Sequence, residues 1–167
     1  MKNLIVVRHA KSSWDAPLRD FDRPLQQRGI MDAHKVSTSV APHLPKTFTI
    51  ISSPAKRASE TAIIFAQNFS YPVESIRYDE ELYTFDERQL EAIVRSIDND
   101  YDNVILFGHN EAITNFVNKF GDIFVDNVTT SGFVSLTFDS DDWSGISKGK
   151  TRNVVFPRDL KNEFKPI

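Results

Sequence analysis

The chain of 167 residues has the length of one ordinary globular domain and is long enough to bury a full hydrophobic core. Its net charge of −3 argues against a general electrostatic grip on nucleic acid or on an anionic membrane, although a local basic pocket is compatible with it. The absence of cysteine excludes disulfides, thiolate nucleophiles and cysteine-based zinc sites.

The chain carries no stretch that approaches the roughly 20 apolar residues needed to cross a bilayer. The apolar run at residues 4–7 ends at Arg8 and is too short for the hydrophobic region of a signal peptide. We therefore expect a single domain over residues 1–167 in the cytoplasm, with no nucleic-acid or membrane partner. The oligomeric state stays open.

Strand-like and helix-like segments alternate in the first half of the chain. Residues 3–7 form a β-branched run typical of a strand buried on both faces, and the polar stretch 9–28 predicts a long loop. Apolar spacing predicts a helix over 26–40, and a second strand follows at 48–51. Residues 52–54, Ser-Ser-Pro, are expected to cap the next helix. The apolar positions of the two helices are Ile30, Ala33, Val36 and Val40, then Ala58, Thr61, Ala62 and Phe65.

The same alternation continues to the end of the chain. The predicted elements are an extended segment at 72–78, a helix at 85–97, a strand at 104–107, a helix at 111–120, and strands at 133–138 and 152–156 joined by a polar loop at 139–150. This order predicts an α/β three-layer sandwich with a mostly parallel central sheet and an antiparallel edge strand. Ligands bind such sheets beyond the carboxyl ends of their strands.

Histidine and arginine side chains follow three of these strand ends. Arg8 and His9 come after the first strand, Arg57 follows the second, and His109 follows the strand at 104–107. Arginine presents a planar fork of donors suited to phosphate oxygens, and imidazole is a competent nucleophile near neutral pH. We expect these groups to form a phosphoryl-transfer site in which the histidine attacks and the cations stabilise the developing charge.

The motif residues are Arg8-His9-Ala10 after the first strand, Ser53-Pro54 with Arg57-Ala58 and Thr61 after the second, and Gly108-His109 after the fourth. This ordered set resembles the histidine phosphatase (phosphoglycerate mutase-like) superfamily, which implies a phosphoglycerate mutase-like fold. Further stretches resemble its SixA-like phosphohistidine phosphatase branch, at 8–14, 22–25, 28–29, 131–132, 141–143 and 157–160. The resemblance covers almost the whole chain.

The resemblance implies a role for each motif residue. His9 is expected to be the nucleophile that becomes phosphorylated, while Arg8 and Arg57 bind the phosphoryl oxygens. His109 is expected to be a second phosphate ligand. The neighbours Lys11 and Asn110 are candidate substrate contacts. No metal ion and no other cofactor is expected to take part.

Two positions depart from the superfamily pattern. Ala10 stands where glycine is usual, and Thr84 stands where relatives that cleave sugar or alkyl phosphates carry an acidic residue. A general acid raises the reaction rate by about 10²–10⁴-fold when the leaving group is poor. An imidazole leaving group needs it less, so we expect a preference for phosphohistidine on proteins. The carboxylates that remain open as substitute acids are Glu80, Glu81, Asp86 and Glu87.

Two other functions remain in competition. One is a broad phosphomonoesterase for small phosphorylated substrates, and the other is a non-catalytic module that binds a phosphorylated protein. His34 and His43 have no metal-ligand spacing and are expected to have surface or packing roles. The charged run 19–23 is interpreted either as a solvated loop or as a rim that contacts substrate, and the acidic run 139–142 as a solvated turn.

Overall fold

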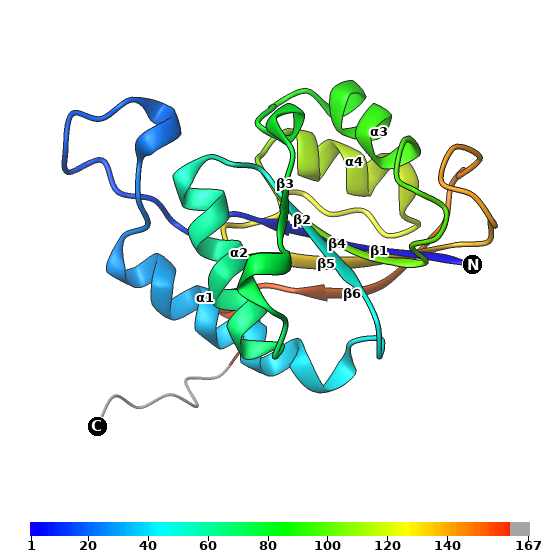
Figure 1. Ribbon diagram of the computed structural model, residues 1–167, viewed down its shortest axis with the longest axis horizontal. Coiled ribbons are helices and arrows are strands. Elements are labelled where there is room, and N and C mark those ends of the chain that lie inside the picture. Colours follow the sequence, from blue (N-terminus) through cyan, green and yellow to red (C-terminus); the bar gives the residue numbers. More distant parts are fainter. Residues whose placement is uncertain (161–167) are drawn as a thin grey trace.

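A six-stranded sheet runs through the part of the chain that the computed structural model describes, residues 1–160. The end of the predicted domain, residues 161–167, lies outside the described residues. The strands are β1 (Lys2–Arg8), β2 (Thr49–Ser52), β3 (Arg77–Tyr78), β4 (Asn103–Gly108), β5 (Phe133–Phe138) and β6 (Lys150–Val155). Their order is β3-β2-β4-β1-β5-β6 (Figure 1). The first four are parallel and the last two pair antiparallel, which confirms the predicted fold class.

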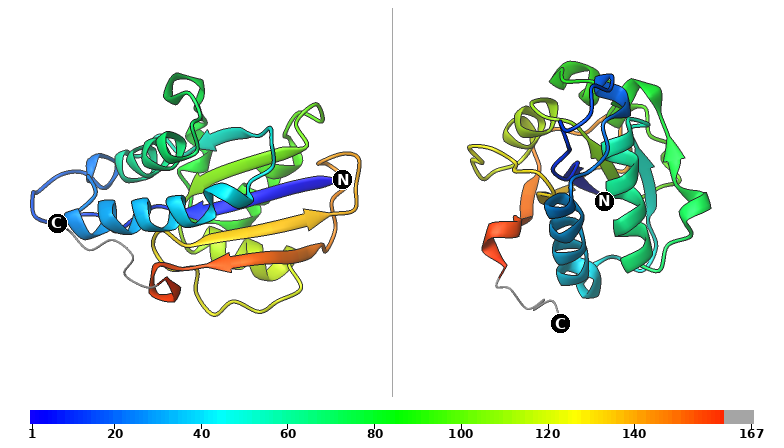
Figure 2. Two further views of the ribbon diagram at one scale, coloured as in Figure 1. Left: turned by 90° about the horizontal axis from the view of Figure 1, so that it is seen from below. Right: turned by 90° about the vertical axis from the view of Figure 1, so that its left-hand side faces the viewer.

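Two pairs of helices cover the two faces of the sheet (Figures 1 and 2). Helices α1 (Gln27–Val40) and α2 (Lys56–Asn68) pack on one face, and α3 (Glu87–Arg95) and α4 (Ala112–Phe120) on the other. Alternate residues of β1 divide between the two cores, as period-two geometry requires: Leu4 and Val6 face α3 and α4, while Ile5 and Val7 face α1 and α2. Both cores are therefore fixed by the same central strand.

Helix α1 begins one residue later than predicted and buries a slightly different stripe. Ile30, predicted to face the core, is 39 % exposed, whereas its neighbour Gly29 is buried. The reason is a close approach of backbones, because a Cβ atom at Gly29 would lie 2.2 Å from the carbonyl oxygen of Lys11. The helix thus turns its glycine toward the loop that follows β1, and Ile30 is displaced to the surface.

The predicted cap of α2 is wrong. The helix begins at Lys56, its N-cap residue is Ala55, and among the described residues no side-chain hydrogen bond caps it. The hydroxyl of Ser53 instead lies 2.8 Å from Nε2 of His109, across the sheet edge. The apolar side of this helix is as predicted, with Ala58, Thr61, Ala62 and Phe65 all buried.

Parts of the predicted loops are more ordered than their composition indicates. The extended segment at 72–78 contains a short 3-10 helix, Val73–Ser75, before β3. In the loop 139–149, the acidic run is largely exposed, but Trp143 is fully buried and its Nε1 donates to the carbonyl oxygen of Tyr101 at 2.7 Å. Among residues 1–160, no helix is both long and apolar enough to cross a membrane.

Candidate active site

Three chain segments meet at the carboxyl edge of the parallel strands. β1 and β2 flank β4, with Arg8 opposite Gly108 and Ser52 opposite Phe107. The ladder continues one residue further, because the backbone N–H of His9 donates to the carbonyl of Gly108 at 3.1 Å. The residues that follow the three strands therefore face one another, as the strand-end rule predicts.

His9 presents a defined ring nitrogen to this edge. Its imidazole is 9 % exposed, and Nδ1 lies 2.7 Å from the carbonyl oxygen of Ala10. A carbonyl oxygen only accepts, so Nδ1 must carry the ring proton in the neutral imidazole and Nε2 must carry the lone pair. Nε of Arg57 donates to that same Nε2 at 3.4 Å. The nitrogen with nucleophilic character therefore faces a guanidinium.

The backbone behind His9 is held from two sides. Thr61 Oγ1 accepts from the N–H of Ala10 at 2.9 Å and donates to the carbonyl of Arg57 at 2.7 Å, so one hydroxyl joins the His9 segment to α2. On the other side, the N–H of Ser131 donates to the carbonyl oxygens of Arg8 and His9 at 3.1 and 3.2 Å. These bonds fix the direction in which the imidazole leaves the strand.

Two arginines bring buried positive charge to the site. Arg57 is 2 % exposed, and its Nη1 and Nη2 donate to the backbone and side-chain oxygens of Asp20 at 2.7 and 2.9 Å. Arg8 donates from Nη1 to the carbonyl of Val128 at 2.9 Å, while its buried Nε has no hydrogen-bond partner among the described residues. Guanidinium donors left over in such a place suit a bound oxyanion.

His109 lies opposite His9, with the two ring centroids 5.2 Å apart. It is 1 % exposed, and within residues 1–160 its buried Nδ1 has no hydrogen-bond partner. The rings of Tyr83 and Phe85 pack against it with centroids at 5.3 and 5.6 Å. Like Arg8, His109 thus holds an unsatisfied polar atom at the edge where the strands end.

Burial and local charge keep both histidines neutral. Burial is the main cause that lowers the pKa of His9 to about 4, and the charges of Arg57 and Arg8 add to it, against the opposing hydrogen bond to Ala10. Burial also lowers the pKa of His109 to about 3, with further contributions from His9 and Arg57. At neutral pH both imidazoles are therefore uncharged.

Lys11 and Asn110, the two candidate substrate contacts predicted from the sequence, make their contacts away from the His9 and His109 rings. Lys11 is exposed, and its carbonyl accepts from the N–H of Gln26 at 3.0 Å. The side chain of Asn110 donates to Asn127 at 2.8 Å and accepts from the Thr114 hydroxyl, so it ties α4 to the loop before β5.

The four candidate acids take other tasks or lie at the surface. Asp86 caps α3 by accepting from the N–H of Arg88, and Glu87 lies 3.9 Å from Lys119. Glu80 and Glu81 are exposed in a 3-10 helix. Thr84, at the position of the absent acid, is buried, donates to Gln89 and accepts from the N–H of Asp86.

The carboxylate that does contact the site belongs to Asp20, which the sequence left as one member of a charged run. It bridges Arg57 and the hydroxyl of Tyr83, a second residue that the sequence did not single out. The only signal for Asp20 in the sequence is its place in the loop that follows His9. Among residues 1–160, no three His, Cys, Asp or Glu side chains are grouped so as to hold a metal ion.

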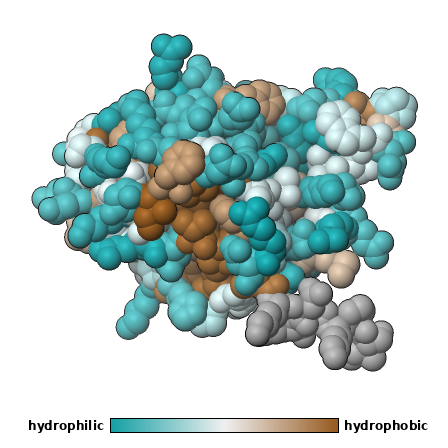
Figure 3. All heavy atoms as spheres, turned by 180° about the vertical axis from the view of Figure 1, so that it is seen from behind, coloured by the Kyte–Doolittle hydropathy of each residue, from teal (hydrophilic) through white to brown (hydrophobic). Residues whose placement is uncertain are grey.

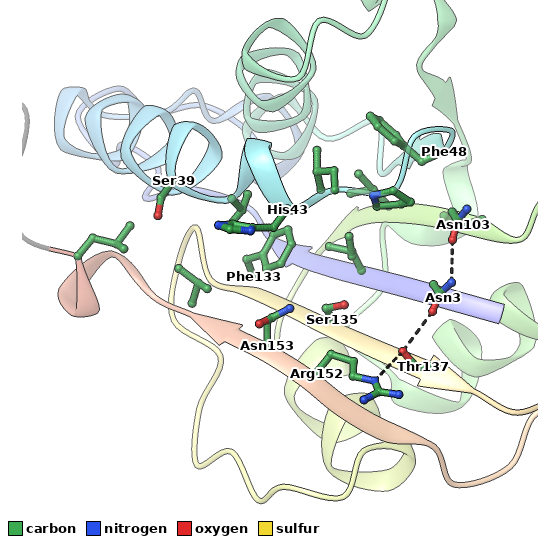
Figure 4. A pocket seen from close by; sticks show the side chains of 18 residues that line it. Asn3, Ser39, His43, Phe48, Asn103, Phe133, Ser135, Thr137, Arg152 and Asn153 are labelled. Carbon is green, nitrogen blue, oxygen red and sulfur yellow. Dashed lines mark hydrogen bonds between the residues drawn. The ribbon is translucent and has the colours of Figure 1, made fainter. Parts of the chain in front are cut away.

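A separate cavity of about 630 Å³ lies between the end of α1 and the sheet (Figure 4). A polar ladder crosses its floor, with Asn3 bonded to Asn103 and Thr137, and Thr137 bonded to Arg152. None of the predicted site residues lines this cavity. Apolar side chains also gather in a hollowed area on the face of the molecule that lies behind Figure 1 (Figure 3).

Comparison with known protein families finds one match in the first half of the chain. Residues 4–82 match the model of the histidine phosphatase superfamily (branch 1). The match covers a little under half of the chain, so it is a likeness to this superfamily in the N-terminal part. The match includes the segments that carry Arg8, His9 and Arg57.

The individual proteins that it resembles are distant or only partly aligned. The structure of the protein histidine phosphatase SixA complexed with tungstate has a TM-score of 0.80 at 22% identity, with 95% of this chain and 99% of that chain covered. The structure of the putative phosphohistidine phosphatase SixA from Nakamurella multipartitia has a TM-score of 0.77 at 22% identity, with 93% of this chain and 96% of that chain covered. At that identity the likeness shows a shared fold.

One sequence relative is closer over a shorter stretch. An uncharacterized chloroplastic protein of Arabidopsis thaliana is 48% identical over 63 residues. The aligned stretch makes up 36% of this chain and only 28% of that relative's own length.

Proposed function

We propose that this chain hydrolyses phosphohistidine in proteins through a phosphorylated intermediate on His9, with residues 1–167 acting as one domain. The observation that carries the proposal is the state of the His9 ring. Its Nδ1 proton is engaged by Ala10, and its Nε2 lone pair faces Arg57 in a buried site. A neutral, fixed imidazole of this kind is a nucleophile that needs no prior deprotonation.

The proposed reaction has two displacement steps. Nε2 of His9 attacks phosphorus, the P–N bond of the substrate breaks, and its electron pair goes to the departing imidazole nitrogen. Water then attacks phosphorus, the P–Nε2 bond breaks, and inorganic phosphate leaves with the pair returned to Nε2. The proton lost by water passes to phosphate or solvent.

Charge stabilisation in both steps comes from side chains. Arg57 already contacts Nε2 of His9. Nε of Arg8 and Nδ1 of His109, which have no partner within residues 1–160, are available to meet phosphoryl oxygens. Fixed donors in a site of low dielectric are worth more than the same donors in water. We propose that they do the work for which other phosphatases use metal ions.

The substrate preference follows from the leaving group. Thr84 stands in place of an acid, and its hydroxyl is engaged with Gln89 and the turn before α3. The Asp20 carboxylate is bound by arginines and ionised, because donors from Tyr83 and Arg57 outweigh the effect of burial and lower its pKa to about 2. A site without a proton donor favours a leaving group that is already protonated, such as imidazolium, over an alkoxide. The protein histidine phosphatase named among the similar folds fits this preference.

The test compares initial rates on a phosphohistidine peptide and on an alkyl phosphate of similar size, with and without EDTA. We expect a strong preference for the peptide, no effect of EDTA, and an acid-labile phosphoenzyme. His9→Ala should form no phosphoenzyme, whereas His43→Ala, at an exposed histidine, serves as the matched control. Comparable rates on the two substrates would contradict the preference, and EDTA-sensitive activity would contradict the metal-free mechanism.

A further inference from the structure

Arg57 uses two different sides of its guanidinium. Nη1 and Nη2, at the tip, hold the carbonyl and carboxylate oxygens of Asp20 at 2.7 and 2.9 Å. Nε, on the flank, points to Nε2 of His9 at 3.4 Å. Because the guanidinium is planar and rigid, fixing its tip also fixes the direction of its flank. Asp20 therefore determines how Arg57 faces the nucleophile.

Asp20 is itself held in place by other donors. The hydroxyl of Tyr83 donates to the Oδ2 that Arg57 also holds, and Nη2 of Arg23 donates to Oδ1 at 3.2 Å. Arg23 is in turn buried, donates to the hydroxyl of Ser12 at 2.6 Å, and has its guanidinium carbon 3.4 Å from the ring centre of Trp14. The carboxylate is thus immobilised through both oxygens.

We infer that Asp20 is a positioning residue for Arg57, and that it aligns the guanidinium flank with the phosphoryl group attacked by His9. This inference rests on the proposed function and extends it to a residue of the loop after β1. The Nε–H on the flank donates to Nε2 of His9. It becomes available to a phosphoryl oxygen when Nε2 attacks phosphorus, while Asp20 still occupies the tip. Asp20 therefore stays in place during the reaction and does not compete with the substrate.

A catalytic consequence follows from the geometry. An arginine released from its anchor still carries its charge and still attracts phosphate, but it samples many rotamers. Loss of Asp20 should therefore lower the rate of phosphoryl transfer more than the affinity for phosphate. A misplacement of about 1 Å in a catalytic group costs on the order of 10²-fold in rate.

The first experiment compares Asp20→Asn with Asp22→Asn. Asp22 lies in the same short 3-10 helix (Asp20–Asp22), but its carboxylate accepts from the exposed Arg19 at 2.9 Å. We expect Asp20→Asn to lower kcat by about 10- to 100-fold. Inorganic phosphate should inhibit this variant at least as strongly as it inhibits the wild type. Asp22→Asn should behave as the wild type. An unchanged kcat in Asp20→Asn, or phosphate inhibition weakened in parallel with kcat, would overturn the inference.

A double-mutant cycle separates positioning from a general effect on folding. If Asp20 acts through Arg57, Asp20→Asn should add little to the loss of kcat already caused by Arg57→Lys. Full multiplication of the two losses would overturn the inference. Tyr83→Phe removes one of the donors that hold Asp20, and should give a smaller loss of kcat of the same kind even if Asp20→Asn folds poorly.

An NMR measurement needs no turnover. The Nε–H resonance of Arg57 should be sharp in the wild type and in Asp22→Asn, and broadened or lost in Asp20→Asn. A signal that persists in Asp20→Asn would refute the anchoring itself. Absence of a phosphoenzyme in the wild type would instead contradict the proposed function, so the two failures are distinguishable.

Discussion

Acidification should destabilise the folded protein through its two buried histidines. An unfolded chain binds a proton on each imidazole at an ordinary pKa of about 6.5, whereas the folded pKa values of His9 and His109 lie at about 4 and about 3. Well above pH 6.5 both states are neutral, so the full stability is present. It falls as the pH drops through 6.5 toward those folded values, because only the unfolded chain gains protons.

The magnitude follows from the size of the shifts. Each histidine should cost about 1.4 kcal/mol of unfolding free energy per pH unit inside this window. Between pH 7.5 and pH 5, the two together should remove about 4 kcal/mol, a large part of the 5–15 kcal/mol that is typical of a domain. Burial is the first cause of both shifts, so the effect should persist in high salt.

Urea unfolding at several pH values measures this directly. His109→Gln removes one of the two titrating groups and keeps a side-chain amide that can bond to Ser53. Its free energy of unfolding should therefore fall less steeply with decreasing pH than that of the wild type, by about 1.4 kcal/mol per pH unit. Carboxylate effects cancel in that comparison. His43→Gln reports what removal of an exposed imidazole does by itself. Parallel curves for the wild type and His109→Gln between pH 6.5 and pH 5 would refute the reasoning.

Three further substitutions test the supports of the site and are measured by urea unfolding and initial rates. Gly29→Ala should cost about 1–3 kcal/mol and lower the rate, since its Cβ would lie 2.2 Å from the Lys11 carbonyl in the segment after His9. Ser53→Ala removes the partner of Nε2 of His109 and should cost about 1–3 kcal/mol, with a lower rate. Trp143→Ala removes a fully buried side chain from the core between the sheet and helices α3 and α4. It should cost about 3–5 kcal/mol without changing kcat of the folded fraction. Unchanged stability in any of the three would contradict the packing or hydrogen bond assigned to it.

The sequence predicted best what local periodicity and strand ends determine. The buried strand at 3–7, the apolar side of α2 and the meeting of His9, Arg57 and His109 all follow from such rules. The strand-end rule works because parallel strands must end at the same edge, so residues far apart in the chain become neighbours without any knowledge of side-chain packing.

What the sequence missed depends on contacts between distant segments. Serine is a residue type that commonly caps helices, but the hydroxyl of Ser53 is hydrogen-bonded to the buried His109, which follows another strand. Ile30 fits the helical period, but the approach of Gly29 to Lys11 turns the helix. Propensity describes what a segment prefers alone, and in each case a tertiary contact outweighed it.

The charge arrangement shows how a chain of net negative charge would hold the phosphoryl group of the proposed reaction. Arg8, Arg23 and Arg57 all act on the His9 imidazole, and the carboxylate of Asp20 compensates part of that charge through two of them. Within residues 1–160 the buried Nε of Arg8 has no hydrogen-bond partner, and the neutral imidazole of His9 adds no negative charge to balance the guanidinium groups. A bound phosphoryl dianion would supply the missing negative charge there. The net charge of −3 is therefore a poor guide to this site, because it averages over a surface that a buried anion pocket does not share.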